Sequence, residues 1–600
     1  TTLTEIRYLQ NQYKNNLELY KTLGFSEGFA GFIGFEHMRH GYLNELLYIF
    51  QARKNTDQPL NTSSTGLTSS NYNAMAYGKS SRSFYYLMQY LGEEKFDSIM
   101  EDFITQWAFK HPYPEDIQQH FQQSTEKDLS WFFEDLTKTD KKIDYKIKAR
   151  KNNQIKIKNK GNLAGPLNIQ GLNKGANRFS IWEEGFTGSK WISIPSGNFD
   201  QIAIDPDNKM LELYRHNNYY KTSGILKQVE PLNLQFGGFM NHPEYTQVHF
   251  LPSVAWNYYD KAMFGMLFYD APLPPDKLDY YLAPMISTGS GNFAGTGTIN
   301  FNFYTNSFFK TIDLNLSGKQ YSISDVYPGQ FQQLKAEAVL GLSGKNRYID
   351  PKTTLHFSFI NATAIEDVED RILNNTNNPF SKNNYYTLTF EHNQFNRTIN
   401  PYKFSANLKR SDNFTKAWVE GQYKYSYYRN EGLTLRVFGG TFLETVDNLP
   451  WNYAFHLSGE NGFQDYSYER TFLGRFEPPQ IENAIRILTQ QFYPTDGAFI
   501  LYSNLGITKD WMASFNVKTS LPLIKEIPIH AYANFGIFGN TYETQVDVKN
   551  NSWAIESGFK LSFLNLIDIY FPVAASANLE KANRSITKGY GEQIRFHIRF

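Results

Sequence analysis

The chain lacks several features that would assign it to a common class. It has no cysteine among its 600 residues, which excludes disulfides and thiolate metal sites. Its 59 basic residues balance its 59 acidic ones, so the formal net charge is zero and we expect no nucleic-acid partner. No stretch approaches the ~20 consecutive apolar residues of a transmembrane helix. The residues from Thr1 onward do not have the pattern expected of a signal peptide.

Aromatic residues, in contrast, are abundant. The chain contains 49 Phe, 41 Tyr and 9 Trp. Together with many Asn, Thr and Gly residues, this content favours a large β structure with belts of aromatic side chains. The length allows three or four domains.

The C-terminal part shows long alternating runs from about Leu232 onward. Apolar and polar residues alternate strictly over 298–303, 311–316, 402–409 and 513–521. A transmembrane β-strand needs ~9–11 such residues, apolar toward lipid and polar toward the lumen. The strands of a soluble sandwich alternate too, but they have only about 5–6 residues. The run lengths favour a barrel over a soluble β repeat.

The last residues support the barrel. Ile594, Phe596 and Ile598 alternate with Arg595, His597 and Arg599, and Phe600 ends the chain. A terminal strand that closes on Phe resembles the C-terminal assembly signal of bacterial outer-membrane barrels. Its basic face must meet water or a filled polar interior.

We count about 16 candidate strands in residues 240–600. The longest gaps, 363–383 and 445–496, are expected to be extracellular loops, because periplasmic turns are short. An even strand count puts both ends of the barrel, and whatever precedes it, on the periplasmic side.

Two regions precede the barrel. Residues 1–140 show helical spacing, with one apolar stripe over Leu3, Ile6, Leu9 and Tyr13. Residues 141–225 contain short alternating runs separated by Gly, Asn and Pro, which predict a small antiparallel β-sandwich. The predicted domains are therefore 1–140, 141–225 and 232–600.

The first helix contains the pattern Thr4-Glu5-Ile6-Arg7-Tyr8, and Glu27 follows 18 residues after Tyr8. In zinc peptidases with His-Glu-x-x-His, the two His face the same way on a helix and hold the metal, and the Glu acts as general base. A second Glu on the next helix completes the metal shell. Here Glu5 occupies the base position, while Thr4 and Tyr8 replace the two His.

Further segments follow in the order of one family. Tyr77-Gly78-Lys79-Ser80 looks like a Tyr-x-Lys-Gly motif, and Asp57-x-Pro59 precedes it. With Glu27-Gly28-Phe29-Ala30 and the helices at 91–96, 107–112 and 128–133, residues 1–145 resemble the aminopeptidase N-type gluzincin family. The resemblance implies the α-helical C-terminal part of a thermolysin-like peptidase domain. The family's upstream Gly-x-Met-Glu-Asn motif is not in the sequence, so we expect a domain that is incomplete at its N-terminus.

The resemblance implies catalytic positions at Glu5, the base, and Tyr77, which stabilises the tetrahedral intermediate. Glu27 is the only retained metal-ligand position, and a Thr hydroxyl and a Tyr phenol are poor zinc ligands. We therefore expect vestigial positions, no metal and no cofactor, with zinc only if the protein is an active enzyme. Glu5 and Tyr77 could still form a polar pocket for a peptide terminus.

Two other patterns could form binding sites. His37 and His40 share a helix face and could hold a metal with a carboxylate, although paired surface His are more common than ligands. Residues 289–295 form a glycine-rich run between β segments. It does not open a helix, so it predicts a hairpin turn rather than a phosphate site.

Together these features predict a Gram-negative outer-membrane protein with a helical peptidase-like part, a small β-sandwich and an antiparallel transmembrane β-barrel of about 16 strands. The favoured function is that of an inactive peptidase homologue that binds peptides or proteins, or acts as a scaffold, in an envelope complex. The alternatives are an active membrane-tethered zinc aminopeptidase and a passive pore. Expected partners are outer-membrane lipid and other envelope proteins or peptides, with the peptidase-like part in the periplasm.

Overall fold

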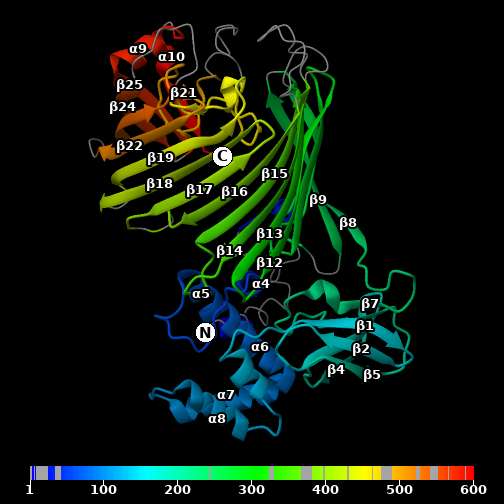
Figure 1. Ribbon diagram of the computed structural model, residues 1–600. Coiled ribbons are helices and arrows are strands. Elements are labelled where there is room, and N and C mark those ends of the chain that lie inside the picture. Colours follow the sequence, from blue (N-terminus) through cyan, green and yellow to red (C-terminus); the bar gives the residue numbers. More distant parts are fainter. Residues whose placement is uncertain are drawn as a thin grey trace.

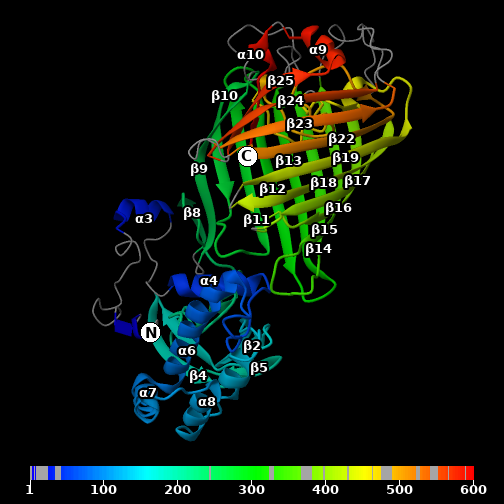
Figure 2. The same ribbon diagram turned by 90° about the vertical axis from the view of Figure 1, so that its left-hand side faces the viewer.

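The computed structural model describes residues 3–5, 7–8, 24–33, 42–241, 245–257, 259–322, 330–365, 382–395, 397, 399–428, 431–462, 464–473, 489–521, 528–540, 552–564, 566–587 and 589–599. A large barrel lies at one end, and helices with two small sheets lie at the other (Figures 1 and 2). The predicted order of helical, small β and barrel regions is therefore present. The exact domain boundaries remain a prediction.

The helical region follows the apolar periodicity of residues 42–136. The segments are α3 (Glu27–Ile33), α4 (Tyr42–Arg53), α5 (Ser69–Asn73), the π-helical turn η1 (Ala74–Lys79), α6 (Ser80–Leu91), α7 (Glu93–Trp107), α8 (Pro114–Gln123) and the π-helical turn η2 (Trp131–Leu136). Buried aromatic residues dominate where α6 meets η2, with Tyr86 and Trp131 ring centroids 4.7 Å apart. Such pairs add ~0.5–1.5 kcal/mol beyond their buried area.

Residues 145–221 form two small antiparallel sheets. One contains β1 (Tyr145–Lys151), β2 (Gln154–Asn159) and β5 (Ser189–Ser193), in that order. The other has the order β4 (Ala176–Glu183), β3 (Leu167–Asn173), β6 (Gln201–Ile204) and β7 (Tyr219–Lys221), preceded by the turn η3 (Arg215–Asn218). Alternating Ile side chains of both sheets, such as Ile157 and Ile169, are fully buried in the same core as the helices. The two regions therefore share one hydrophobic core.

The remaining strands close into a barrel. They are β8 (Leu232–Phe236), β9 (Thr246–Asn257), β10 (Lys261–Tyr269), β11 (Leu278–Ser287), β12 (Phe293–Tyr304), β13 (Phe309–Ser322), β14 (Gln330–Leu342), β15 (Thr353–Ile365), β16 (Lys382–Asn393), β17 (Tyr402–Arg410), β18 (Phe414–Tyr428), β19 (Glu431–Thr445), β22 (Trp511–Leu521), β23 (Ile529–Phe538), β24 (Trp553–Phe563), β25 (Ile567–Ala575) and β26 (Arg595–Ile598).

From β9 to β26 each of the described barrel strands pairs antiparallel with the next, which gives the predicted sixteen. The strand order then closes the barrel through β26, β8 and β9. β8 differs from the expectation of a purely antiparallel barrel, because it pairs in parallel with β9. Because the number of consecutive antiparallel strands from β9 to β26 is even, the start of β9 and the end of β26 lie at the same end of the barrel, as predicted.

The strand faces also follow the predicted alternation. Phe301 on β12 is 46% exposed on the outer surface and stands between Leu278 and Leu314 of the neighbouring strands. Asn302 points to the other side, where its amide donates to Asp279 at 2.6 Å. The apolar face is outside and the polar face inside, which is the pattern of a lipid-facing barrel. The glycine-rich run 289–295 lies at the β11–β12 hairpin, as expected.

The C-terminal strand is shorter than the alternation from 592 to 600 suggested. Residues Tyr590–Gln593 form the short helix α10, and β26 begins only at Arg595. Arg595 is 3% exposed and lies inside the barrel, which agrees with a filled polar interior. Phe600, the proposed assembly signal, lies outside the described residues.

The long β19–β22 connection, predicted to be an external loop, folds into the barrel instead. It carries the turn η5 (Trp451–Tyr453) and the short strands β20 (Phe455–His456) and β21 (Ile507–Thr508). Phe455 and Phe499 are buried against inward-facing Phe438 and Met512 of the wall. The gap 363–383 lies largely outside the described residues. We refer to the described residues 446–462, 464–473 and 489–510 as the lumen segment.

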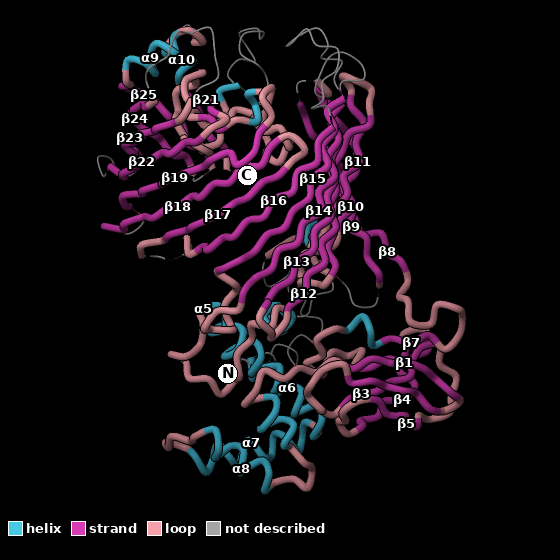
Figure 3. Tube along the Cα trace, in the orientation of Figure 1, coloured by secondary structure: helices cyan, strands magenta, loops and turns pink. Residues whose placement is uncertain are grey.

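Helices lie at both ends of the barrel (Figure 3). α9 (Ala577–Arg584) and α10 lie at the end opposite the helical region, within the β25–β26 connection. No helix among the described residues is long and apolar enough to cross a membrane.

Candidate functional site

The first predicted site residue, Glu5, lies on a short helical segment beside α7. Arg7 of this segment donates two hydrogen bonds to the carboxylate of Asp97, at 2.6 and 2.8 Å. This bidentate pair fixes the segment against α7. Thr4, Glu5 and Tyr8 are all exposed, Tyr8 by 61%.

Glu27 is exposed at the start of α3, which packs on the barrel at β8 (Figure 2). The rings of Phe32 and Phe236 lie 5.8 Å apart, and the amide of Phe239 donates to the carbonyl of Ile33 at 3.4 Å. Gly237 permits this approach, since its φ is +69° and a Cβ there would lie 2.6 Å from the carbonyl oxygen of Phe32. The helix with the retained ligand position is therefore held by the barrel.

Tyr77 lies in the π-helical turn η1, which packs against α4. Gly78 follows it, and a Cβ at Gly78 would lie 2.6 Å from the carbonyl oxygen of Asn44 on α4. The Tyr77 side chain is 45% exposed, and its ring centroid lies 6.2 Å from that of Tyr72. π-Helical turns often occur at functional sites.

Lys79, the third residue of the Tyr-x-Lys motif, is buried in an ion cluster inside the helical region. Its side chain is fully buried, with Nζ 4.0 Å from Asp57, whose carboxylate also pairs with Lys142 at 2.9 Å. Burial lowers the pKa of Lys79. The Asp57-x-Pro59 and Tyr-x-Lys segments therefore meet in an internal ion cluster.

The three predicted site residues have different neighbours. Glu5 lies on the segment fixed to α7, Glu27 on the helix packed against β8, and Tyr77 on the turn packed against α4. No group of three His, Cys, Asp or Glu residues that could hold a metal occurs in the described part of the chain. His37 and His40 lie outside it. The oxygen donors at Thr4 and Tyr8 do not fit a zinc ion, which prefers imidazole, thiolate or carboxylate.

A second buried ion cluster joins the helices to the small sheets, and the sequence analysis missed it. Arg215 of η3 pairs with Glu45 of α4 at 2.9 Å and with Asp205 at 2.5 Å. Arg82 of α6 pairs with Glu45 at 2.9 Å. Nearby, Glu212 accepts a hydrogen bond from a backbone amide through only one oxygen. The five charged residues of this cluster come from separate segments of the chain. They form no sequence motif that would have revealed it.

The helical region is attached to the barrel turns below β10–β15. Arg53, at the end of α4, lies 3.2 Å from Asp276 in the β10–β11 turn and donates to the carbonyl of Pro275 at 3.1 Å. The next residue, Lys54, pairs with Asp350 in the β14–β15 turn at 3.1 Å. These contacts place α4 under one side of the barrel mouth.

The lumen segment is fixed to the wall by buried polar contacts. Glu556 of β24 accepts hydrogen bonds from the amides of Ile500 and Leu501, at 2.6 and 3.0 Å. Arg436 of β19 donates to the carbonyl of Asp496 at 2.8 Å.

The lumen segment also contacts the last strand. Arg595 of β26 donates to the carbonyls of Gln490 and Gln491, at 3.1 and 3.3 Å, and Phe492 donates its amide to Phe596. The barrel interior on this side is filled by protein.

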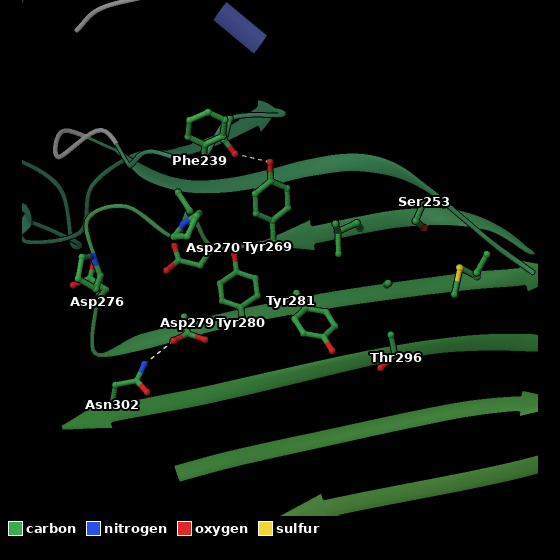
Figure 4. Close-up of a pocket in the computed structure, with 18 of the residues that line it drawn as sticks. Phe239, Ser253, Tyr269, Asp270, Asp276, Asp279, Tyr280, Tyr281, Thr296 and Asn302 are labelled. Carbon is green, nitrogen blue, oxygen red and sulfur yellow. Dashed lines mark hydrogen bonds between the residues drawn. The ribbon is translucent and has the colours of Figure 1, made fainter. Parts of the chain in front are cut away.

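The other side of the lumen contains a cavity of about 930 Å³. The cavity lies against the inner face of β9–β13. Inward-facing side chains such as Ser253, Tyr269 and Asp279 line it (Figure 4). The cavity was not predicted, because only closure of the barrel brings these strands around one space.

Comparison with known proteins gives one family match, which falls in the helical region, and two structural matches. Residues 18–136 match the model of the Peptidase family M1 domain. The positions Thr4, Glu5 and Tyr8 precede the matched range. No curated protein matches the chain.

Two solved structures match at low identity. The chain matches BamA from Haemophilus ducreyi lacking POTRA domains 1–3 with a TM-score of 0.31, 12% identity and coverage of 54% of this chain and 66% of that one. It matches CdiB from Acinetobacter baumannii with a TM-score of 0.28, 10% identity and coverage of 57% and 63%. This chain thus covers slightly less than two thirds of either protein.

Proposed function

We propose that this protein is an outer-membrane-anchored, inactive relative of the M1 peptidases. Its peptidase-like region faces the periplasm and binds peptides or other envelope proteins as a subunit of a larger assembly. The rival function is that of a membrane-tethered zinc aminopeptidase.

The observation that carries the proposal is the chemistry of the residues at the catalytic positions, together with their different packing partners. A catalytic zinc site needs three protein ligands and a general base around one point. Here two of the ligand positions are Thr4 and Tyr8. The remaining one, Glu27, lies on a helix that packs against β8, whereas Tyr77 packs on α4. This arrangement supports a binding role for the region.

The barrel wall supports the membrane location. Outward side chains at mid-strand are large and apolar, including Phe301, Leu316, Phe357 and Phe515, each more than 40% exposed. A continuous exposed apolar surface of this kind is costly in water and is stable in lipid.

The filled lumen supports a binding subunit rather than a passive pore. A pore needs a continuous aqueous channel. The lumen segment fills much of the interior, and Glu556, Arg436 and Arg595 hold it there.

The deciding experiment is elemental analysis of the whole chain, purified in detergent. We expect well under one zinc per chain and no cleavage of aminoacyl reporter substrates. One zinc per chain that is lost in Glu27→Ala, but retained in Glu94→Ala, would establish the aminopeptidase instead. Glu94 is an exposed glutamate of α7 and serves as the matched control.

A further inference from the structure

The cavity on the inner face of β9–β13 has an acidic lining. Asp270, Asp276 and Asp279 line it, whereas no Lys, Arg or His belongs to its wall in the described structure. Asp276 is paired with Arg53 at 3.2 Å. Asp270 and Asp279 form no ion pair among the described residues.

The hydrogen-bond partners of these two carboxylates are neutral. Asp279 accepts a hydrogen bond from the amide of Asn302 at 2.6 Å (Figure 4). It also accepts one from Asn300 at 2.5 Å, and Asp270 accepts one from Asn241 at 3.1 Å. Amide donors hold the carboxylates in place and leave their charge uncompensated. The cavity therefore favours a cation.

Aromatic and hydroxyl groups complete the wall. Tyr269, Tyr281, Tyr304 and Tyr321 provide rings that can contact a cation through their faces. The hydroxyl oxygen of Ser253, also on the cavity wall, is buried and makes no hydrogen bond in the described structure. These groups suit an organic cation with an alkyl chain.

A single metal ion does not suit the cavity. Nowhere in the described residues do three acidic or His side chains come close enough to hold one. The volume, about 930 Å³, is in the upper part of the ~300–1,000 Å³ range of ligand sites. It matches an extended ligand with several groups better than an ion.

Part of the cavity wall, formed by Pro275, Asp276 and Tyr304, lies next to the helical region. Arg53 contacts the β10–β11 turn, and Asn55 donates to the carbonyl of Tyr304 at 2.8 Å. A segment held by the helical region would therefore be close to this part of the cavity.

We propose that the cavity binds a basic segment of a polypeptide, whose ammonium or guanidinium groups pair with Asp270 and Asp279. This inference rests on the proposed function as a peptide-binding subunit, and it names the chemistry of the bound segment. The carboxylates attract the cations, and the Tyr rings contact the alkyl stems.

The test measures binding of a fluorescein-labelled peptide with alternating Arg and Ser to the whole protein in detergent, by fluorescence anisotropy. We expect saturable binding that weakens with salt, and affinity that falls about tenfold or more in D270N/D279N, since two attractive charges are lost. A matched peptide with Gln in place of Arg should not bind.

Glu337→Gln is the control, because Glu337 lines a separate cavity of the lumen, near Lys335. It should change the affinity less than twofold. Absence of Arg-peptide binding, or equal losses in the control and in D270N/D279N, would overturn the proposal. So would spermine that competes as well as the peptide, because the site would then select polyamines. Zinc at one per chain with intact peptide binding would instead overturn the proposed function and leave the cavity assignment standing.

Discussion

At the scale of single residues, the buried charges between helices and sheets are the most consequential feature. Arg215 compensates both Glu45 and Asp205, and all three are at most 8% exposed. A buried pair is not strongly stabilising in itself, but removing one partner leaves a charge without compensation.

Arg215→Met should therefore destabilise the region of residues 42–221 by about 3–5 kcal/mol. Native-state hydrogen exchange of the whole protein would show the loss as faster exchange in α4 and the small sheets. Arg178→Met, at an exposed position on β4, should leave exchange unchanged. Similar exchange in both variants would mean that the cluster is not essential to this core.

Glu212 should make stability depend on pH. Burial, together with repulsion from Asp144, raises the pKa of Glu212 well above its usual range. The unfolded chain loses this proton near its ordinary pKa of ~4.3–4.5. Stability from Glu212 is thus complete below that pH and falls as the pH rises toward the folded-state pKa.

Glu212→Gln should remove this loss. The variant is expected to be more resistant to unfolding than the natural protein at pH 8 and equal to it near pH 4, as measured by hydrogen exchange. Glu115→Gln, at an exposed position of α8, should show no difference at either pH. A gain in Glu212→Gln that is the same at both pH values would contradict ionisation as the cause.

At the scale of elements, each barrel strand has two faces with different environments. Arg in place of Phe301 should cost ~2–4 kcal/mol at the bilayer midplane, whereas Arg in place of Asn302 enters a polar interior and should cost much less. Urea titration of the folded, heat-modifiable form in lipid vesicles would measure both. Equal costs would refute the face assignment.

The exposed apolar side of α3 should contact lipid. Phe29 is 48% exposed and Phe32 40%, beside the outward side chains Leu234 and Phe236 of β8. Because the chain has no cysteine, Phe29→Cys provides a unique position for a nitroxide spin label. In lipid vesicles this label should be more accessible to oxygen than to a water-soluble nickel chelate.

Tyr113→Cys at the start of α8, far from the barrel (Figure 1), should show the opposite preference. Phe301→Cys on the barrel wall is the control for insertion. A label at position 29 that behaves like the one at 113, while position 301 is buried in lipid, would place α3 in water.

At the scale of the whole molecule, the lumen segment decides whether the barrel conducts. We expect the natural protein to show low conductance in planar bilayers. Replacing residues 446–509 with a short Gly-Ser linker should open the barrel, because the ends of the segment are already adjacent: the amide of Phe442 donates to the carbonyl of Asp510 at 2.9 Å.

A large conductance in the natural protein would favour the passive pore, and a closed deletion variant would show that other parts block the lumen. Heat modifiability on a gel verifies that the variant barrel has folded.

The sequence by itself determined the barrel, the faces of its strands and the M1-like helices. Strand alternation has a period of two and depends only on neighbouring residues, so Phe301 and Asn302 could be assigned to opposite faces without a structure. The motif around Tyr77 and the missing imidazoles at Thr4 and Tyr8 were equally local.

Only the tertiary structure decided what depends on distant segments meeting. The inward path of the lumen segment and the cluster of Arg215 with Glu45 join residues far apart in the chain. The parallel pairing of β8 with β9 and the acidic cavity involve neighbouring strands, but they depend on how those strands pair and curve around one space. The position of Glu27 belongs here too, because packing of Phe32 on Phe236 directs α3 to the barrel. Local sequence patterns carry no information about these tertiary contacts. The contacts are determined by loop closure and burial once the helices and strands pack together.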